Sequence, residues 1–405
     1  MSSSLWIGAT GMTAVDKQLD VIGNNLANSS TVGYKASNTQ FSSMLSQTLS
    51  GGSGNMQVGQ GVSLSAINTD FSQGSFQTTS NVTDLAIDGE GLFITRDTDS
   101  GLTYYTRNGA FTIDEDGYVV NSDGYRVQGN MFASGSEVYN LGDVNLEGIQ
   151  SQPVTTTTVQ VGANLNAQAA TGDVFSVSQT TYGNDGAEYT MTINYTKTAN
   201  PREWSIAGTL EDVNGNITNA AAIATLVTFN ASGVMLTPAA NVPFTFAGVN
   251  IGTGGVINWD VTTAGVSKLT GYASDSAVTS VKANGYPAGS LNSISIGADG
   301  VVTGAFSNGQ TENLARIMLA DFANYGGLSK VGTYFVETDK SGAPLINNPG
   351  AGSLGNIQAS SLEVSNTDVA AEFINMITAQ RAYQACAKVV TTANDLLTVL
   401  MNIKQ

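Results

Sequence analysis

Two short clusters of acidic residues have a spacing that could suggest a metal-binding site. Asp97-Thr98-Asp99-Ser100-Gly101 and Asp114-Glu115-Asp116-Gly117 each gather carboxylates within a few positions. A calcium loop of the EF-hand kind spreads its ligands over about twelve residues and ends on a bidentate Glu, which neither segment supplies. Both segments carry the Asp and Gly typical of tight turns, so we interpret them as acidic hairpin turns.

Other catalytic and cofactor chemistries find little support. The chain holds no histidine, which excludes Ser-His-Asp and Cys-His catalysis and His-ligated metals. Its single cysteine, Cys386, excludes an intramolecular disulfide and multi-cysteine zinc sites, and we expect it to be a small buried residue in a helix. Gly59-Gln60-Gly61 lacks the rest of a dinucleotide fingerprint. Two carboxylates brought together in space would suffice for glycoside hydrolysis, so a polysaccharide-active enzyme stays a minor alternative. We expect no catalytic, cofactor or metal site.

The charge balance points away from nucleic acids and membranes. Charged residues make up 12% of the 405 residues, with 32 acidic against 15 basic side chains, and no basic stripe stands out. No apolar run approaches the roughly 18 residues of a membrane span. Residues 1–20 lack the features of a cleaved secretory leader. A neutral, polar surface can pack against copies of itself without desolvating many charges.

Both ends of the chain show helical periodicity. Met12, Val15, Leu19, Ile22 and Leu26 alternate at spacings of three and four, which places apolar side chains on one helical stripe. The same alternation runs near the carboxyl end through Val369, Phe373, Met376, Gln380, Tyr383, Ala387, Val390, Asn394 and Leu397. Ser365, Asn366 and Thr367 are candidate helix caps, and Asp368 suits the first turn. We expect the helices to pair with each other and with neighbouring copies, although an ordinary two-helix hairpin on a globular body stays open.

The interior of the chain reads as strands and turns. Asp116-Gly117 and Asp123-Gly124 separate short β-forming runs, and residues 294–309 repeat that pattern far downstream. Between them Tyr189, Met191, Ile193 and Tyr195 alternate as in a half-buried strand. The sequence therefore predicts an α+β fold, mostly β, with paired coiled-coil-like terminal helices and nested β domains, the outer one inserted in the middle. The expected division is terminal helices 1–28 and 365–405, linking segments 29–70 and 330–364, an inner β domain 71–150 and 281–330, and an outer β domain 151–280.

The segment that ends the first helix is rich in amides. Asn24, Asn25 and Asn28 are poor inside a helix but good at its end, where their amides satisfy orphan backbone groups. Gly33 permits a sharp exit of the chain, and Tyr34 and Lys35 follow it.

The amino-acid sequence of this segment resembles the signature of the flagellar axial family, which comprises the rod and hook proteins. The residues that match this motif are Asn24, Asn25, Ala27, Asn28, Gly33, Tyr34 and Lys35. Four further segments resemble family motifs in the right order, namely 84–93, 105–111, 320–328 and 362–384. The resemblance covers roughly the first 130 and last 100 residues. About 130 additional residues in the middle favour the hook type of subunit over the shorter distal rod type, which stays an alternative. The stretch 42–61, with Ser50-Gly51-Gly52-Ser53-Gly54, departs from the hook pattern, and rod proteins carry an insertion near this place.

The resemblance implies a structural subunit that polymerises into a flexible hollow tube and transmits torque from rod to filament. It also implies an extracellular location and export, without a cleaved signal, through the flagellar type III apparatus. Implied partners are copies of the chain, the distal rod protein, the hook cap protein and the hook–filament junction protein, with no nucleic acid and no membrane insertion. The residues that we expect at the subunit interface are Leu19, Ile22, Leu26, Phe373, Met376, Tyr383, Val390 and Leu397. A secreted β-rich adhesin is a less favoured alternative.

Overall fold

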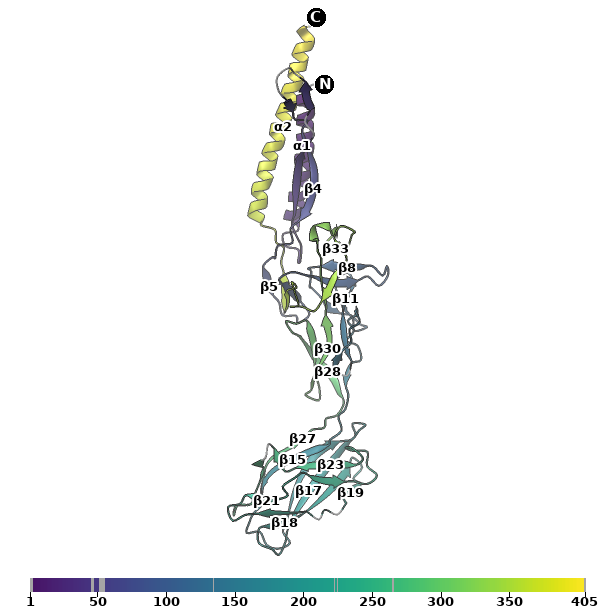
Figure 1. The fold of residues 1–405 in the computed structure, drawn as a ribbon, viewed down its shortest axis with the longest axis vertical. Coiled ribbons are helices and arrows are strands. Elements are labelled where there is room, and N and C mark those ends of the chain that lie inside the picture. Colours follow the sequence, from purple (N-terminus) through teal and green to yellow (C-terminus); the bar gives the residue numbers. More distant parts are fainter. Residues whose placement is uncertain are drawn as a thin grey trace. The chain divides into compact units, whose positions relative to one another are not determined.

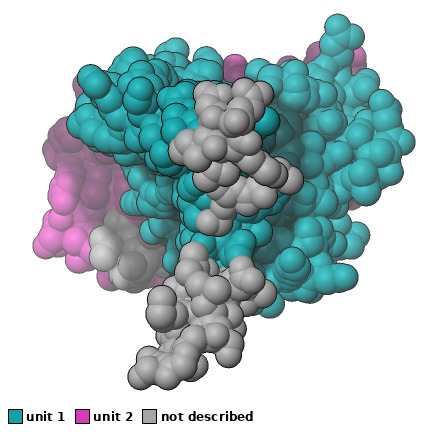
Figure 2. Space-filling model, turned by 90° about the horizontal axis from the view of Figure 1, so that it is seen from above, with its two compact units in different colours: residues 1–148, 294–304, 312–405 teal, residues 149–293, 305–311 magenta. Residues whose placement is uncertain are grey.

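The computed structural model describes residues 3–44, 47–50, 55–133, 135–221, 223, 225–263 and 266–403. The chain divides into two compact units, coloured separately in Figure 2. Unit 1 contains residues 1–148, 294–304 and 312–405, and unit 2 contains residues 149–293 and 305–311. The middle of the chain is thus an insertion between two halves of unit 1, as predicted.

Unit 1 begins and ends with long helices, α1 (Ser3–Ala27) and α2 (Val369–Ile403), which Figure 1 shows side by side. The carboxylate of Asp368 accepts hydrogen bonds from the backbone N–H of Ala370 and Ala371, at 2.9 and 3.1 Å, and so caps α2. Asp368, which we expected in the first turn, is therefore the residue that caps the helix. Among the described residues, no helix is long and apolar enough to cross a membrane.

A β-ribbon follows α1. Strand β1 (Ser37–Ser43) pairs antiparallel with β4 (Val62–Thr69), and both contact α1. Between them, β2 (Gln47–Ser50) pairs with β3 (Asn55–Val58). The stretch 42–61, which departs from the hook pattern, is therefore part of this ribbon, apart from residues 45–46 and 51–54, which lie outside the described residues.

The body of unit 1 is a large, mainly antiparallel sheet built from both flanks of the insertion. Strand β11 from before it pairs with β30 from after it, with Gly129 opposite Ile317. The main path of strands is β29 (Val301–Phe306), β30 (Thr311–Ile317), β11 (Arg126–Ala133), β7 (Leu92–Arg96), β8 (Thr103–Thr106), β33 (Tyr334–Val336) and β32 (Ser329–Val331). Shorter strands join it: β9 (Thr112–Ile113), β10 (Val119–Val120), β12 (Ser136–Glu137), β13 (Gly142–Asp143), β31 (Leu319–Asp321) and β34 (Leu345–Asn347). Its core includes Leu92, Ile94, Tyr105, Phe322 and Phe335.

Two small ribbons and one short helix complete unit 1. Strand β6 (Leu85–Asp88) pairs with β35 (Asn356–Ala359), and β5 (Phe76–Thr78) pairs with β36 (Ser361–Glu363). The 3-10 helix η1 spans Tyr325–Gly327. These ribbons join segments almost 300 residues apart in sequence, directly before α2.

Unit 2 is all β within its described residues. One sheet contains β22 (Val242–Thr245), β23 (Val256–Asp260), β15 (Thr158–Asn164), β26 (Leu269–Thr270) and β27 (Ala277–Ala283). The other contains β16 (Val174–Tyr182), β17 (Glu188–Lys197), β18 (Glu203–Asp212), β20 (Leu226–Phe229), β21 (Met235–Thr237) and β19 (Ile217–Asn219). A small pair, β24 (Thr262–Thr263) and β25 (Val266–Ser267), lies apart from both.

The alternation predicted for β17 is confirmed at the core of unit 2. Met191, Ile193 and Tyr195 are buried there with Trp204 and Trp259. The chain enters the unit on β14 (Gln150–Ser151) and leaves it on β28 (Gly289–Ile296), and these strands pair with Gln150 opposite Ser290. The two ends of the insertion therefore lie together.

Candidate assembly site

Small residues bring α1 and α2 close together near the start of α1. A Cβ on Gly8 would lie 2.8 Å from Cγ2 of Val390, and one on Gly11 would lie 2.9 Å from Sγ of Cys386. Both distances are too short for real side chains, so these glycines let the helix backbones approach closely. Ala379 of α2 is also buried. The helices are antiparallel, because the start of α1 contacts the far part of α2.

The predicted interface residues divide into an inner and an outer group. Ile22 is buried, and Leu19, Leu26, Met376 and Val390 are partly buried. The outer group, Phe373, Tyr383 and Leu397, is exposed in the protomer. The helical period placed these residues on helices correctly. Whether they contact neighbouring copies stays a prediction.

A large part of the apolar surface of α2 is unused within the chain. Phe373 is 49% exposed and Ile374 is 62% exposed, although both are large apolar side chains. The α2 apolar face, as we call it, comprises Val369, Phe373, Ile374, Ile377, Tyr383, Val389, Leu396, Leu397, Val399 and Met401. An open apolar cavity of about 430 Å³ adjoins it, with Ser4 of α1 and Val389 and Leu396 of α2 among its lining residues. Large apolar side chains left exposed in this number are unusual on a protein that functions alone and are characteristic of protein–protein interfaces.

The amide-rich motif anchors the end of α1 to the start of α2. The Asn25 amide nitrogen donates to Oε1 of Glu372 at 2.7 Å and to the backbone oxygen of Ser37 at 2.8 Å. Its oxygen accepts from the backbone N–H of Ser37 at 2.9 Å and from the hydroxyl of Tyr34 at 3.2 Å. This buried amide uses both donors and accepts twice, so it fixes both helices and the first strand at one point.

Beneath this anchor lies a buried cluster of three charges, Lys35, Arg107 and Glu363. Nζ of Lys35 is 2.7 Å from Oε1 of Glu363, and Nη1 of Arg107 is 3.1 Å from Oε2. Their side chains are 1%, 4% and 0% exposed. Burial lowers the pKa of the Lys35 ammonium, and Glu363 opposes that shift. One carboxylate therefore offsets two cations, and each lies in a different motif segment of the family.

Backbone groups add further hydrogen bonds to the cluster, although Nε of Arg107 is buried without a partner among the described residues. Arg107 donates to the backbone oxygens of Gly89 and Ile87, at 2.6 and 3.2 Å, and Lys35 donates to that of Ser72 at 2.7 Å. The backbone N–H of Gly74 donates to Glu363 at 2.8 Å. Such contacts are needed because buried charges are stable only when paired and hydrogen-bonded. The cluster thus joins the exit of α1, a hairpin of the sheet and the strand before α2.

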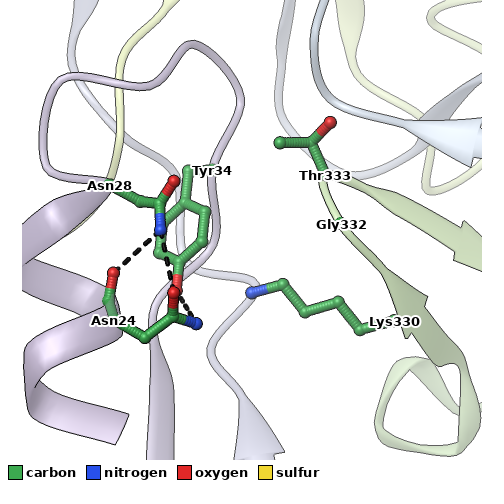
Figure 3. A pocket seen from close by; sticks show the side chains of 6 residues that line it. All are labelled: Asn24, Asn28, Tyr34, Lys330, Gly332 and Thr333. Atoms are coloured by element: carbon green, nitrogen blue, oxygen red, sulfur yellow. Dashed lines mark hydrogen bonds between the residues drawn. The ribbon is translucent and has the colours of Figure 1, made fainter. Parts of the chain in front are cut away.

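A polar pocket of about 340 Å³ opens beside the anchor, lined by Asn24, Asn28, Tyr34, Lys330, Gly332 and Thr333 (Figure 3). Nζ of Lys330 lies 4.0 Å from the centre of the Tyr34 ring and donates to the backbone oxygen of Lys35 at 2.7 Å. Burial lowers the pKa of Lys330 to about 8. Burial, and then the charge of Glu372, raise the pKa of the Tyr34 phenol. Residues from both flanks of the insertion thus meet in this pocket.

Sequence reasoning found the motif segments but not what joins them. Glu363, Lys35 and Arg107 stood in three separate motifs, and nothing in their spacing indicated a common cluster. The one available signal was the scarcity of charge, since a chain with only 12% charged residues carries at least one in each motif. Lys330 lies outside the quoted motifs. Among the described residues, no group of three His, Cys, Asp or Glu side chains could hold a metal ion.

Comparisons with known proteins match the whole chain. The family models that match are "Flagella basal body rod protein" at residues 5–35, "Flagellar hook protein FlgE/F/G D1 domain" at 86–167, "Flagellar basal body protein FlaE D2 domain" at 147–286, and "Flagellar basal body rod FlgEFG protein C-terminal" at 358–403. The flagellar hook protein FlgE of Borreliella burgdorferi is 34% identical over 100% of both chains. The chain belongs to the flagellar hook protein family.

A second hook protein shows a similar level of identity. That of Escherichia coli is 32% identical over 98% of each chain. A solved structure, Helicobacter pylori flagellar hook protein FlgE2, aligns with 71% of this chain and 100% of its own, at 15% identity and a TM-score of 0.48. This hook-family chain is therefore a structural subunit of the flagellar hook, which forms part of the flagellum outside the cell. The relatives named here carry the hook name over the full chain, which decides between the hook and rod alternatives.

Proposed function

We propose that the α2 apolar face is the surface through which copies of this hook subunit assemble into a hollow tube. The observation that carries the proposal is the contrast on α2 itself. Ala379 and Ala393, both small, are buried against the rest of the chain, while Phe373, Ile374 and Ile377 remain exposed. Burying one such large side chain contributes roughly 1.5–3 kcal/mol, so an interface that covers several gains a large driving force.

In this proposal the helices and the β domains have different tasks. The terminal helices 1–28 and 365–405 line the inner channel, the segments 29–70 and 330–364 link them to an inner β domain (71–150 and 281–330), and the outer β domain (151–280) lies outermost. Contacts between outer domains are polar and small, so they can slip as the tube bends. The tube then acts as a universal joint that transmits torque from rod to filament. The compact inserted unit at 149–293 supports this division.

Family membership also supports specific partners. We infer that the tube grows from the distal rod protein, that the hook cap protein covers its growing end, and that the hook–filament junction protein succeeds it. The subunit reaches that end through the flagellar type III export apparatus, without a cleaved signal. A chain exported unfolded would complete its helix pair on arrival, because the α2 apolar face is buried only among copies.

The test of the assembly surface is a charge placed on it. Tyr383 is 41% exposed on α2, whereas Tyr139, in a loop of unit 1, is 83% exposed and serves as a matched control. Tyr383→Asp buries a carboxylate in the proposed interface, so the concentration needed for tube formation should rise at least about tenfold. Tyr139→Asp should assemble as the unmodified chain does. Electron microscopy and sedimentation of the full-length proteins give the measurement, and normal assembly of Tyr383→Asp would refute the proposed surface.

A further inference from the structure

The ammonium of Lys330 has no carboxylate partner within the described residues, in a chain rich in acids. Its one hydrogen bond runs to the backbone oxygen of Lys35 at 2.7 Å, and the Tyr34 ring covers one side of it at 4.0 Å. None of the ion pairs among the described residues includes it. An ammonium carries three N–H groups, so those not used by the Lys35 oxygen have no hydrogen-bond partner among the described residues.

The other polar side chains around the pocket provide hydrogen-bond donors that are free within the described part of the chain, while their amide oxygens already accept hydrogen bonds. The Asn24 amide nitrogen gives one hydrogen to the Tyr34 hydroxyl at 3.3 Å and keeps the second. The amide oxygens of Asn24 and Asn28 already accept, from Asn28 at 3.0 Å and from Thr31 at 3.1 Å. The Thr333 hydroxyl makes no hydrogen bond among the described residues. The pocket therefore offers N–H and O–H donors around one cation, which suits an anion.

The shape of the pocket suits a side chain rather than a large ligand. Figure 3 shows Lys330 reaching from β32 toward Tyr34, with Asn24 and Asn28 on the helix side of the same opening. The volume of about 340 Å³ holds one acidic side chain with some water. A nucleic acid or another polyanion is disfavoured, because the net charge of −17 repels it.

A second copy of the chain is the source of carboxylates that the composition favours. With 32 acidic and 15 basic residues, every protomer carries more carboxylates than its own cations can pair. In an assembly of identical copies these carboxylates are present at high local concentration. We infer that the Lys330 pocket binds the carboxylate of an Asp or Glu side chain from a second copy of the chain. The inference rests on the proposed assembly and names one polar contact within it.

Such a contact would act on elements from both flanks of the insertion. The pocket lies where the end of α1 meets the hairpin β32–β33, and a carboxylate bound there would bridge the two through Lys330, Asn24 and Thr333. Burial lowers the pKa of Lys330 to about 8, so its charge is poorly compensated in the free protomer. An incoming carboxylate would supply the missing countercharge and raise that pKa again.

A carbodiimide cross-link tests the contact directly. The reagent activates a carboxyl group, Nζ of the lysine attacks the carboxyl carbon, an amide C–N bond forms, and the displaced oxygen leaves in the urea. Full-length chains in unlabelled and ¹⁵N-labelled forms are mixed, polymerised and treated. We expect mass spectrometry to find Lys330 joined to an Asp or Glu of the differently labelled copy in polymers and not in monomers. Polymers without this cross-link, in which other lysines are joined, would overturn the inference.

Variants give a second readout. Lys330→Met removes the charge and keeps the stem, and Lys340→Met makes the same change at an exposed lysine of unit 1. We expect Lys330→Met to fold but to need roughly three- to tenfold more protein to polymerise, while Lys330→Arg and Lys340→Met stay near the unmodified chain. Unchanged assembly of Lys330→Met would overturn the pocket contact alone, whereas an unmodified chain that never polymerises would overturn the proposed function and this inference together.

The last arm separates a side chain from a small anion. Inorganic phosphate in excess is added to monomers of the unmodified chain and of Lys330→Met, and thermal unfolding is recorded. We expect no Lys330-dependent stabilisation, because the pocket is built for a tethered carboxylate present at high local concentration. Stabilisation of the unmodified chain alone, with loss of the cross-link in phosphate, would show that the site takes a free anion and would overturn the second copy as its occupant.

Discussion

The helix pair of unit 1 and the core of unit 2 use apolar residues in opposite ways. In unit 2, Tyr195, Trp204, Phe244 and Trp259 are almost fully buried between the strands of one protomer. On α2, large apolar side chains such as Ile374 are exposed, and the buried apolar residues among those described are the small Ala379 and Ala393. Unit 2 thus buries its core within one protomer, whereas the helix pair leaves much of its apolar surface exposed. Under the proposed function, the difference separates a part that folds by itself from a part that assembly completes.

Removal of unit 2 is the strongest way to break this comparison. Because Ser151 pairs with Gly289 on β14 and β28, residues 152–288 can be replaced by a short Gly-Ser turn. We expect the shortened chain to fold and polymerise, since both helices and the sheet of unit 1 are untouched. Tubes built from it should be straight, because we expect contacts between outer domains to hold the shortened inner side of a curved tube, and these contacts would be absent. Electron microscopy of the tubes gives their curvature.

The control is the excised segment itself. Residues 152–288, expressed alone, contain the apolar core of unit 2 and should unfold cooperatively on heating. Tubes of the shortened chain with unchanged curvature would remove the mechanical role of the outer domain. A shortened chain that fails to fold would show that unit 1 depends on unit 2.

The buried charge cluster offers a smaller and more local test of the helix pair. Glu363→Gln leaves Lys35 and Arg107 buried without their shared countercharge, and breaking a buried pair in this way costs about 3–5 kcal/mol. We expect unit 1 to lose stability by about that amount and unit 2 to keep its own. Chemical denaturation, followed by hydrogen exchange in each unit, measures both.

An exposed ion pair provides the matched control for this substitution. Asp20→Asn removes the partner of Lys17, 2.9 Å away on the exposed surface of α1, where solvent screening leaves such pairs little effect on stability. Equal losses in the two variants would mean that the cluster has no special place in joining the ends of the chain.

The helices and strands could be predicted from the sequence more completely than the way they pack together. Helical and alternating periods reflect how side chains distribute around an element, so α2 and the burial of Met191 and Ile193 followed from pattern alone. The helical periodicity did not predict the close approach of the two helices. That approach depends on the small residues Gly8, Gly11 and Cys386, whereas the periodic pattern is recognised from large apolar residues.

The candidate site was predicted only as separate segments. Motif strings marked the regions of Lys35, Arg107 and Glu363, but Lys35 and Glu363 stand 328 positions apart and meet through sheet pairing. One sequence contains no signal for such long-range pairing. Lys330 was not predicted for a related reason. The feature that marks it is the lack of a carboxylate partner among the described residues, and its neighbours in the sequence give no sign of this.

The smallest expected effect concerns the proton on Lys330 in the free protomer. Burial lowers its pKa from 10.5 to about 8, so between these values the unfolded chain holds a proton that the folded chain has lost. Stability of unit 1 should therefore rise with pH from about 8 to about 10, by roughly 1 kcal/mol once the half-exposed position is allowed for. Titratable groups on the elements around it include Tyr34, whose ring lies 4.0 Å from Nζ, Lys35, whose backbone oxygen accepts from Nζ, and Tyr334 on the paired strand β33.

None of these neighbouring groups reverses the expected rise in the stability of unit 1 between about pH 8 and 10. The pKa of Tyr34 and the pKa of Tyr334 are raised, so the stability they contribute is lost only as pH rises through their unfolded value near 10. The pKa of Lys35 is lowered, which adds a slope of the same sign as that of Lys330. The difference in unfolding free energy between the unmodified chain and Lys330→Met isolates the Lys330 contribution. In polymers this Lys330-dependent rise in stability with pH should vanish, because a carboxylate in the pocket would keep Lys330 protonated. A Lys330-dependent rise that persists in polymers would mean that assembly leaves the pocket without a carboxylate from a second copy.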